Sequence, residues 1–439
     1  MQELKNLMRD FGIVGAGGAG FPSYAKLADG ADLLVINGSE CEPLLATDYI
    51  LLRDELDLVL QGVSEIIRKT SISKAYMAVK AHNAERLGWK DGDRLCDGVF
   101  VRALPDIYPI GDEISLIYEA TGRLIKPGKL PITEGIIVYN VETMYNLGRA
   151  LRYKEPVTTK WLTIGGDVKK PTVIKVPIGA RLADIFERLG IEVKEGYTVL
   201  DGGPSMGKVI NPRTYAVNKT TKGILILPDN SQAVLSKLTN EEIATKRAET
   251  ACCQCTRCTD MCPRHLLGYP LEPHKMVRTA KGAVEVMPDM VISATLCCGC
   301  GVCESLACNQ GISPRAVIDN YKKLLSKNKL RFDKNGEYSV MAERDYRMIP
   351  YKKWMSALGV SQFDKDTDFG GEINDFSRVE MTLSRHIGAP SIPAVKDGDI
   401  VSAGDLIASA AEGLSLPQHA AISGRVTLGK DKIIIDKVR

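Results

Sequence analysis

Ten of the chain's twelve cysteines fall in two short runs, and their spacing is the clearest chemical signal in the sequence. The first run contains the spaced set Cys252, Cys255, Cys258 and Cys262, followed at once by Pro263. The second run contains the spaced set Cys297, Cys300, Cys303 and Cys308. Three thiolates separated by two residues each fit a [4Fe–4S] cluster, because a short, tightly turning loop can direct three sulfurs at three irons. The fourth iron then needs a ligand from farther along the chain.

The fourth cysteine of each run is expected to serve the other cluster, as in ferredoxins that hold two clusters. We therefore assign Cys308 to the cluster of the first run and Cys262 to the cluster of the second. Cys253 and Cys298 remain as spare thiols, each adjacent to an assigned ligand. Using Cys253 in place of Cys252 would break the spacing to the next cysteine, so we prefer the register that begins at Cys252.

Zinc sites and disulfides are two other uses of closely spaced cysteines. Zinc knuckles also use Cys-x2-Cys pairs, but they take two pairs per metal, whereas each run here has three evenly spaced cysteines and a fourth. Disulfide frameworks are typical of small secreted domains, and this chain has 439 residues with few cysteines outside the runs. The pattern favours two iron–sulfur clusters in a reducing compartment.

The overall composition is that of a globular protein with several domains. The chain is 44% hydrophobic and 25% charged with a net charge of +3, so the charge balance does not indicate nucleic acid or an anionic membrane as a partner. The N-terminus has scattered charges and lacks the apolar segment of a secretory signal. No stretch approaches the roughly 18 apolar residues of a membrane span. These features predict a soluble, cytoplasmic protein without a membrane span.

A glycine-rich segment near the N-terminus is a candidate site for a phosphate-bearing ligand. It follows a short amphipathic helix expected over residues 2–11, and it contains Gly15, Gly17, Gly18, Gly20 and Phe21. Glycines let the backbone approach a ligand closely. We expect a helix that begins at Pro22, whose free N–H groups face a phosphate, with Lys26 one turn in. The segment also matches G-x-G-x-x-G, but a helix precedes it instead of a strand, so this fingerprint is weak.

Polar residues follow two predicted buried strands, one over 32–37 and one at the start of 135–150. These residues are Asn37, Glu40 and Glu42 after the first strand, and Asn140, Glu142 and Thr143 after the second. Between them we expect a helix over 47–69 and strands over 74–80 and 98–102. The alternation indicates an α/β domain, and open α/β sheets bind ligands at the carboxyl ends of their strands.

The motifs GAGGAGFP, INGSECEP and NVET, in this order, resemble the flavin- and NADH-binding domain of the 51-kDa subunit of complex I and of the C subunit of Rnf-type complexes. The segment 108–123 also resembles the Rnf-type subunit. The resemblance implies FMN as a cofactor and NADH as its electron donor. The residues that it implies around FMN are Gly15, Gly17, Gly18, Gly20, Lys26, Asn37, Glu40, Glu42, Asn140, Glu142 and Thr143. It also implies that Phe21 and Glu42 lie near the nicotinamide nucleotide.

The sequence after the N-terminal domain predicts several smaller domains. Short strands, one helix and Gly/Pro turns after Trp161 predict a β-grasp module, which resembles the SLBB domain of the same families. The C-terminal tail resembles the barrel-sandwich fold of biotinyl and lipoyl carriers, but no lysine stands at the hairpin where a carrier is modified. We therefore expect a multidomain α/β and α+β protein. Its parts are a Rossmann-like FMN/NADH domain (1–157), a β-grasp SLBB domain (158–235), a ferredoxin-like domain with two [4Fe–4S] clusters (240–325), a linker or helical region (326–375) and a barrel-sandwich hybrid (376–439).

The order of these units, together with the segments CPRHLLGYP and CCGCGVCESLACNQGISPR, most resembles the cobalamin reductases of propanediol-utilisation microcompartments. The resemblance implies an oxidoreductase that passes electrons from NADH through FMN and two [4Fe–4S] clusters to cobalamin. It also implies a location in the cytoplasm or inside a bacterial microcompartment. Shell proteins or B12-dependent enzymes are the expected partners, and the resemblance is compatible with an oligomer. We find no acid–base pair and no corrinoid motif such as D-x-H-x-x-G in the sequence.

Two other functions remain open at this point. One is an electron-transfer subunit, like the Rnf C subunit, that reduces a protein partner such as another reductase or a membrane complex. The other is a non-enzymatic scaffold in which the clusters are structural. The turn GGPSMG (202–207) and the basic segment 316–355 are assigned no chemistry, because ordinary turns and solvated helix faces have the same composition.

Overall fold

The N-terminal part of the chain forms a mainly parallel sheet. The computed structural model describes residues 1–280 and 288–438. The sheet has the strand order β3-β4-β2-β1-β6, in which β3 runs antiparallel and the other strands run parallel. The strands are β1 (Leu33–Asn37), β2 (Lys74–Lys80), β3 (Arg94–Cys96), β4 (Val99–Leu104) and β6 (Ile136–Asn140).

Strand β1 is apolar on both faces, which explains why both faces of this sheet are covered. Leu34 and Ile36 belong to one core, and Leu33 and Val35 belong to a second core that also includes Cys262. The N-terminal domain therefore packs directly on the region that carries the cysteines. Its helices are α1 (Gln2–Asp10), α2 (Thr47–Asp54), α3 (Leu56–Lys69), α4 (Ala81–Arg86), α5 (Glu113–Thr121) and α6 (Val141–Tyr153).

The next domain is a six-stranded sheet of the order β10-β9-β11-β7-β8-β13. Its two central strands, β7 and β11, are parallel, and each pairs antiparallel with an outer strand, as a β-grasp fold requires. Helix α7 (Leu182–Leu189) buries Leu182, Ile185 and Phe186 in the core that covers the sheet. The strands are β7 (Thr159–Gly166), β8 (Thr172–Pro177), β9 (Tyr197–Asp201), β10 (Lys208–Ile210), β11 (Gly223–Pro228) and β13 (Asp368–Glu372).

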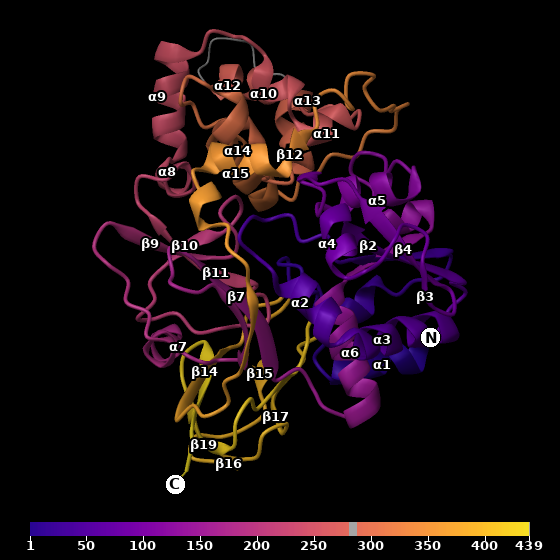
Figure 1. Cartoon of the computed structure of the whole chain (residues 1–439), viewed down its shortest axis with the longest axis vertical. Coiled ribbons are helices and arrows are strands. Elements are labelled where there is room, and N and C mark those ends of the chain that lie inside the picture. Colours follow the sequence, from indigo (N-terminus) through magenta and orange to yellow (C-terminus); the bar gives the residue numbers. More distant parts are fainter. Residues whose placement is uncertain (281–287, 439) are drawn as a thin grey trace.

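The cysteine-rich region, residues 240–327, is helical and lies at one end of the molecule, next to α8 (Gln232–Leu238) (Figure 1). Its helices are α9 (Glu241–Ala251), α10 (Arg257–Asp260), α11 (Pro263–Leu266), α12 (Pro273–Ala280), α13 (Pro288–Ile292) and α14 (Pro314–Lys327). The segment after it returns to the N-terminal domain, where β12 (Ile349–Pro350) pairs with β5 (Ile107–Tyr108) before α15 (Tyr351–Leu358). No helix within the described residues is long and apolar enough to cross a membrane.

The C-terminal domain lies at the opposite end of the molecule from the cysteine-rich region (Figure 1). It consists of a four-stranded sheet and a three-stranded sheet. The strands are β14 (Arg378–Thr382), β15 (Ile392–Pro393), β16 (Ile400–Val401), β17 (Leu406–Ser409), β18 (Gln418–His419), β19 (Gly424–Leu428) and β20 (Lys432–Asp436). Of the predicted domain ranges, 240–325 includes residues 281–287 and 376–439 includes residue 439, which lie outside the described residues.

Two expectations about helices are wrong. The helix predicted after Pro22 is a four-residue 3-10 helix, Ser23–Lys26, so no α-helix N-terminus faces a ligand there. The reason is tertiary: Val14 and Pro22 form a β-bridge, which closes the glycine segment into a tight loop. The helix predicted over 47–69 is two helices, because Glu55 leaves the helical conformation at φ −129° and ψ 25°.

Candidate cofactor-binding sites

Two asparagines mark the carboxyl edge of the parallel sheet. Asn37 ends β1 and Asn140 ends β6, and the two residues are directly paired across the adjacent strands. The Asn140 amide donates to the carbonyl of Asn37 (3.2 Å) and to Oδ2 of Asp48 (3.0 Å). Asn140 also caps α6 by accepting a hydrogen bond from the backbone N–H of Glu142. The fold thus brings both predicted asparagines to the edge where α/β sheets bind ligands.

The glycine loop lies over this edge. The backbone N–H of Ala16 donates to Thr143 Oγ1 (3.1 Å), which ties the loop to the first turn of α6. A Cβ atom added to Gly17 would lie 3.6 Å from Cβ of Asn140. Gly18 has a φ of +115°, and a Cβ there would meet no heavy atom of the described chain within 4 Å. The loop therefore packs on Asn140 at Gly17 and presents bare backbone to open space at Gly18, which fits a flat or phosphate-bearing ligand.

Glu40 is a buried carboxyl with unused hydrogen-bonding capacity. Its Oε2 accepts from the backbone N–H of Asp48 (3.2 Å), whereas Oε1 is buried and has no partner among the described residues. Burial, and then the charge of Asp48, raise the pKa of Glu40 to about 7. A buried polar atom without a partner is costly. This oxygen fits a donor supplied by a ligand such as the flavin.

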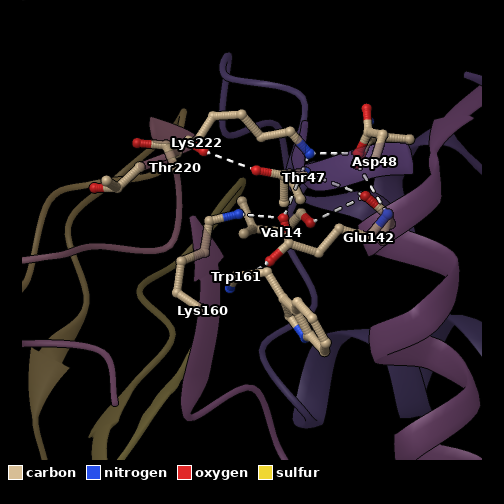
Figure 2. Close-up of polar contacts among 12 residues, drawn as sticks. Val14, Thr47, Asp48, Glu142, Lys160, Trp161, Thr220 and Lys222 are labelled. Carbon is tan, nitrogen blue, oxygen red and sulfur yellow. Dashed lines mark hydrogen bonds and ion pairs between the residues drawn. The ribbon is translucent and has the colours of Figure 1, made fainter. Parts of the chain in front are cut away.

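Glu142 points toward the β-grasp domain instead of the open space. Its carboxylate pairs with Lys160 of β7, lies 3.7 Å from Lys222 Nζ, and accepts from the backbone N–H of Trp161 (3.3 Å). Lys222 in turn pairs with Asp48 (Figure 2). Although burial lowers it, the nearby carboxylates raise the pKa of Lys222 above its usual range. These four charged side chains form a buried network that joins the two domains.

Two other predicted site residues, Glu42 and Lys26, also bond to protein groups. Glu42 accepts from the backbone N–H groups of Ser205 and Met206, both at 2.9 Å, and burial raises its pKa. A Cβ atom at Gly203 would lie 2.1 Å from Glu42 Oε2, so the GGPSMG turn is shaped around this carboxylate. Lys26 Nζ pairs with Glu113 at 2.8 Å.

The outer ends of the glycine loop are fixed by backbone contacts. The N–H of Gly15 donates to the carbonyl of Phe21 (2.8 Å). The carbonyl of Gly20 accepts from the N–H of Ile387 in the C-terminal domain (2.8 Å). Gly15, Gly20 and Phe21 therefore shape the loop and join it to the C-terminal domain, while Gly17 and Gly18 line its open side.

A cavity in the cysteine-rich region is lined by thiols from both runs. Cys297, Cys300 and Cys303 of the second run and Cys262 of the first run surround it. This is the combination that exchange of the fourth ligand between two clusters requires. Burial raises the pKa of Cys262 to about 12. Bound iron would supply the positive charge that keeps such a thiol ionised. We call these four cysteines the inner site.

The remaining four predicted ligands gather closer to the surface. Burial, and then the charges of Cys308, Cys255 and Cys252, raise the pKa of the Cys258 thiol to about 12. Cys252 and Cys308 pack against one small apolar core, although they are far apart in sequence. Cys255 is exposed. We call these four cysteines the outer site.

The two spare thiols differ in their surroundings. Cys253 is exposed next to the outer site. Cys298 lines the inner cavity with Cys297 and Cys300, so the inner site has five thiols within reach. The choice between Cys297 and Cys298 as the first ligand of the second run therefore rests on the ferredoxin spacing.

Sequence reasoning missed several charged residues near these sites. Lys160 and Lys222 come from the β-grasp domain, and no local sequence pattern predicts their pairing with Glu142 and Asp48. Asp112 caps α5 and accepts from the backbone N–H of Ser115, so the D-x-x-S pattern was an available signal for the cap. Its Oδ1 accepts from Arg264, which lines the inner cavity.

Three parts of the chain match known domain families. Residues 8–149 match the Nuo51 FMN-binding domain, residues 251–313 a 4Fe-4S dicluster domain, and residues 372–434 the RnfC barrel sandwich hybrid domain. These matches confirm FMN and two [4Fe–4S] clusters as the expected cofactors, and they favour iron–sulfur clusters over zinc. The fold and the cysteine sites define an iron–sulfur flavoprotein of the oxidoreductase class.

Relatives of the whole chain are more specific. It is 35% identical to cobalamin reductase PduS of Salmonella typhimurium, over 98% of this chain and 96% of that protein. It is also 35% identical to cobalamin reductase PduS of Citrobacter freundii, over 97% of this chain and 94% of that protein. The C subunit of the proton-translocating ferredoxin:NAD(+) oxidoreductase complex of Clostridium ljungdahlii is 32% identical over 61% of this chain and 57% of that protein. The chain belongs to the PduS cobalamin reductase family.

Proposed function

We propose that this protein reduces the cobalt of cobalamin with electrons from NADH. The observation that carries the proposal is the match to cobalamin reductases over 98% of the chain, which includes the FMN-binding, dicluster and barrel-sandwich parts. The Rnf-type subunits match only about 60% of the chain, so they support the alternative of a protein acceptor less well.

The residues at the sheet edge fit FMN. Gly17 and Gly18 offer exposed backbone, and the free Oε1 of Glu40 offers an acceptor. The amides of Asn37 and Asn140 donate to protein oxygens, so these two side chains fix the shape of the edge. When bound, FMN accepts the hydride of NADH as a pair of electrons and releases them one at a time. The protein's task is to hold this ligand, exclude water and keep the clusters close.

The other predicted flavin residues contact protein groups that hold the proposed flavin site in place. Glu142 fixes the position of the β-grasp domain through Lys160, and Thr143 holds the glycine loop through Ala16. Lys26 is held by Glu113 at the same end of the sheet. We propose that these three residues position the flavin-binding edge, together with the backbone of Gly15 and Gly20.

NADH is proposed to bind beside the flavin, near Phe21 and Glu42. Because Glu42 holds the GGPSMG turn through two backbone N–H groups, this carboxylate sets the position of the β-grasp turn beside the nucleotide. The eight cysteines of the inner and outer sites are proposed as the cluster ligands. We also propose a location with B12-dependent enzymes inside a microcompartment, which the same family membership supports.

The test is an anaerobic optical titration of the iron-reconstituted protein with NADH, followed by hydroxocobalamin. We expect NADH to bleach the flavin and cluster absorbance, and hydroxocobalamin to reoxidise the protein as the cob(II)alamin band appears. Bleaching without cobalamin reduction would contradict the proposal and indicate a protein acceptor. A protein that binds no flavin, with clusters that NADH cannot reduce, would indicate a structural scaffold.

A further inference from the structure

One short segment of the N-terminal domain, residues 107–112, contacts the cysteine-rich region at two points. The Tyr108 hydroxyl donates to the backbone carbonyl of Cys300, an inner-site cysteine, at 2.7 Å. Arg264 Nη2 donates to Oδ1 of Asp112, also at 2.7 Å. Both contacts therefore reach the inner site and its immediate surroundings.

The same segment also contacts the carboxyl edge of the parallel sheet, where FMN is proposed to bind and which we call the flavin edge. The Asn37 amide donates to the carbonyl of Gly111 at 3.0 Å, and Asp112 is the next residue. A continuous path of close contacts therefore runs from Asn37 through Gly111, Asp112 and Arg264 to the inner cavity.

The Asp112–Arg264 pair is well placed to be rigid. The two side chains are only 13% and 12% exposed. Asp112 Oδ2 accepts from the backbone N–H and the hydroxyl of Ser115, which leaves Oδ1 for Arg264. A charge-assisted hydrogen bond in such a dry environment holds both partners in one orientation.

The inner and outer sites differ in burial. Cys262, Cys300 and Cys303 are buried, whereas Cys255 of the outer site is exposed. The two sites are also neighbours, because α10, which carries Cys258, packs against the helical segment Cys303–Ala307. The inner site thus lies between the flavin edge and the outer site, and the outer site reaches the surface.

We propose that electrons from the flavin enter the cluster pair at the inner site, across the Asp112–Arg264 contact, and leave from the outer site. This inference rests on the proposed function and assigns an order to its cofactors. Each NADH is oxidised to NAD+ and a proton with release of two electrons. The electrons pass singly through the inner and then the outer site, and reduce two Co(III) centres to Co(II).

Arg264 and Asp112 act as positioning residues that also set the potential of the inner cluster. A positive charge beside a cluster stabilises its reduced, more negative state, so net charge and hydrogen bonds tune its potential. Removing the charge of Arg264 should lower the potential of the inner cluster. Removing the charge of Asp112 leaves Arg264 uncompensated and should raise it. A purely structural pair would not produce shifts of opposite sign.

The order is tested by EPR on two single-cluster variants, Cys300→Ala and Cys255→Ala, reduced anaerobically with NADH or with dithionite. We expect NADH to reduce the remaining inner cluster of Cys255→Ala at the rate of the unchanged protein. In Cys300→Ala, NADH should reduce the flavin, while reduction of the outer cluster is at least tenfold slower. Dithionite should reduce the remaining cluster in both variants. Reduction of the outer cluster by NADH at the unchanged rate in Cys300→Ala would overturn the inference.

A second measurement does not depend on losing a cluster. EPR redox titrations of Arg264→Gln and Asp112→Asn should show the potential of one cluster shifted down and up, respectively, with the other unchanged. Asn retains the capping ability of Asp at residue 112. Arg257→Gln, which removes an exposed charge beside the outer site, is the matched control and should leave the potential of the inner cluster unchanged. Equal potentials in all three variants would overturn the inference, whereas failure of NADH to reduce the flavin of the unchanged protein would refute the proposed function instead.

Discussion

Removing one partner of the buried pair of Glu142 and Lys160 should destabilise the contact between the flavin domain and the β-grasp domain. The side chains are 1% and 2% exposed, so neither charge is solvated by water. The variant Glu142→Gln keeps the size of the side chain but leaves the Lys160 ammonium buried without its main partner. Breaking such a buried pair costs about 3–5 kcal/mol. With a urea slope of about 2 kcal/mol/M, the unfolding midpoint should fall by about 2 M.

The assay is urea unfolding of the flavin-free protein, followed by tryptophan fluorescence. Trp161 is a suitable reporter because its backbone N–H contacts Glu142 and its ring is buried. Adding Lys160→Met to Glu142→Gln should recover most of the loss, since no unpaired charge is then buried. The control Lys246→Gln breaks an ion pair whose side chains are 73% and 72% exposed, and it should leave the midpoint unchanged. An unchanged midpoint in Glu142→Gln would refute the reasoning.

Three further predictions concern the cluster ligands and the flavin site. Cys308→Ala should remove mainly the outer cluster, whereas Cys253→Ala should leave the iron content unchanged; equal loss of iron from both clusters in Cys308→Ala would contradict the proposed ligand register. Glu40→Ala combined with Gly17→Val should abolish flavin retention without loss of iron, and full FMN occupancy in this variant would place the flavin elsewhere. Because the pKa of Glu40 is about 7 in the folded protein against an ordinary 4.5, the unfolded state releases this proton first as pH rises. The free energy of unfolding of the flavin-free protein should therefore fall between about pH 4.5 and pH 7, and Glu40→Gln should flatten this part of the profile measured by urea unfolding.

The features that could be predicted from the sequence are those whose chemistry is local. The spacing of the cysteines reflects the geometry of one short loop, and the fold brings Cys262 to the second run as the ferredoxin pattern requires. The neighbouring positions of Asn37 and Asn140 at the sheet edge were predictable, because buried apolar strands can be recognised in the sequence and the carboxyl ends of parallel strands meet at one edge.

The features that could not be predicted depend on contacts between distant segments. Lys222 reaches Asp48 from 174 positions away, and Arg264 reaches Asp112 from 152 positions away. No periodicity or motif carries this information. The helix expected after Pro22 failed for the same reason, since the bridge between Val14 and Pro22 overrides the local preference. Glu142 matched a flavin motif, but its carboxylate is used to join two domains.

The measurement that tests the central claim most directly is the stoichiometry of anaerobic turnover with the reconstituted protein, NADH and excess hydroxocobalamin. The absorbance of NADH and of cob(II)alamin can be followed in the same sample. If NADH supplies electrons to cobalt through the flavin and the clusters, two cob(II)alamin should form for each NADH oxidised, and the rates of both reactions should fall at least tenfold in Cys300→Ala. Oxidation of NADH with reduced flavin and clusters but no formation of cob(II)alamin would contradict the account.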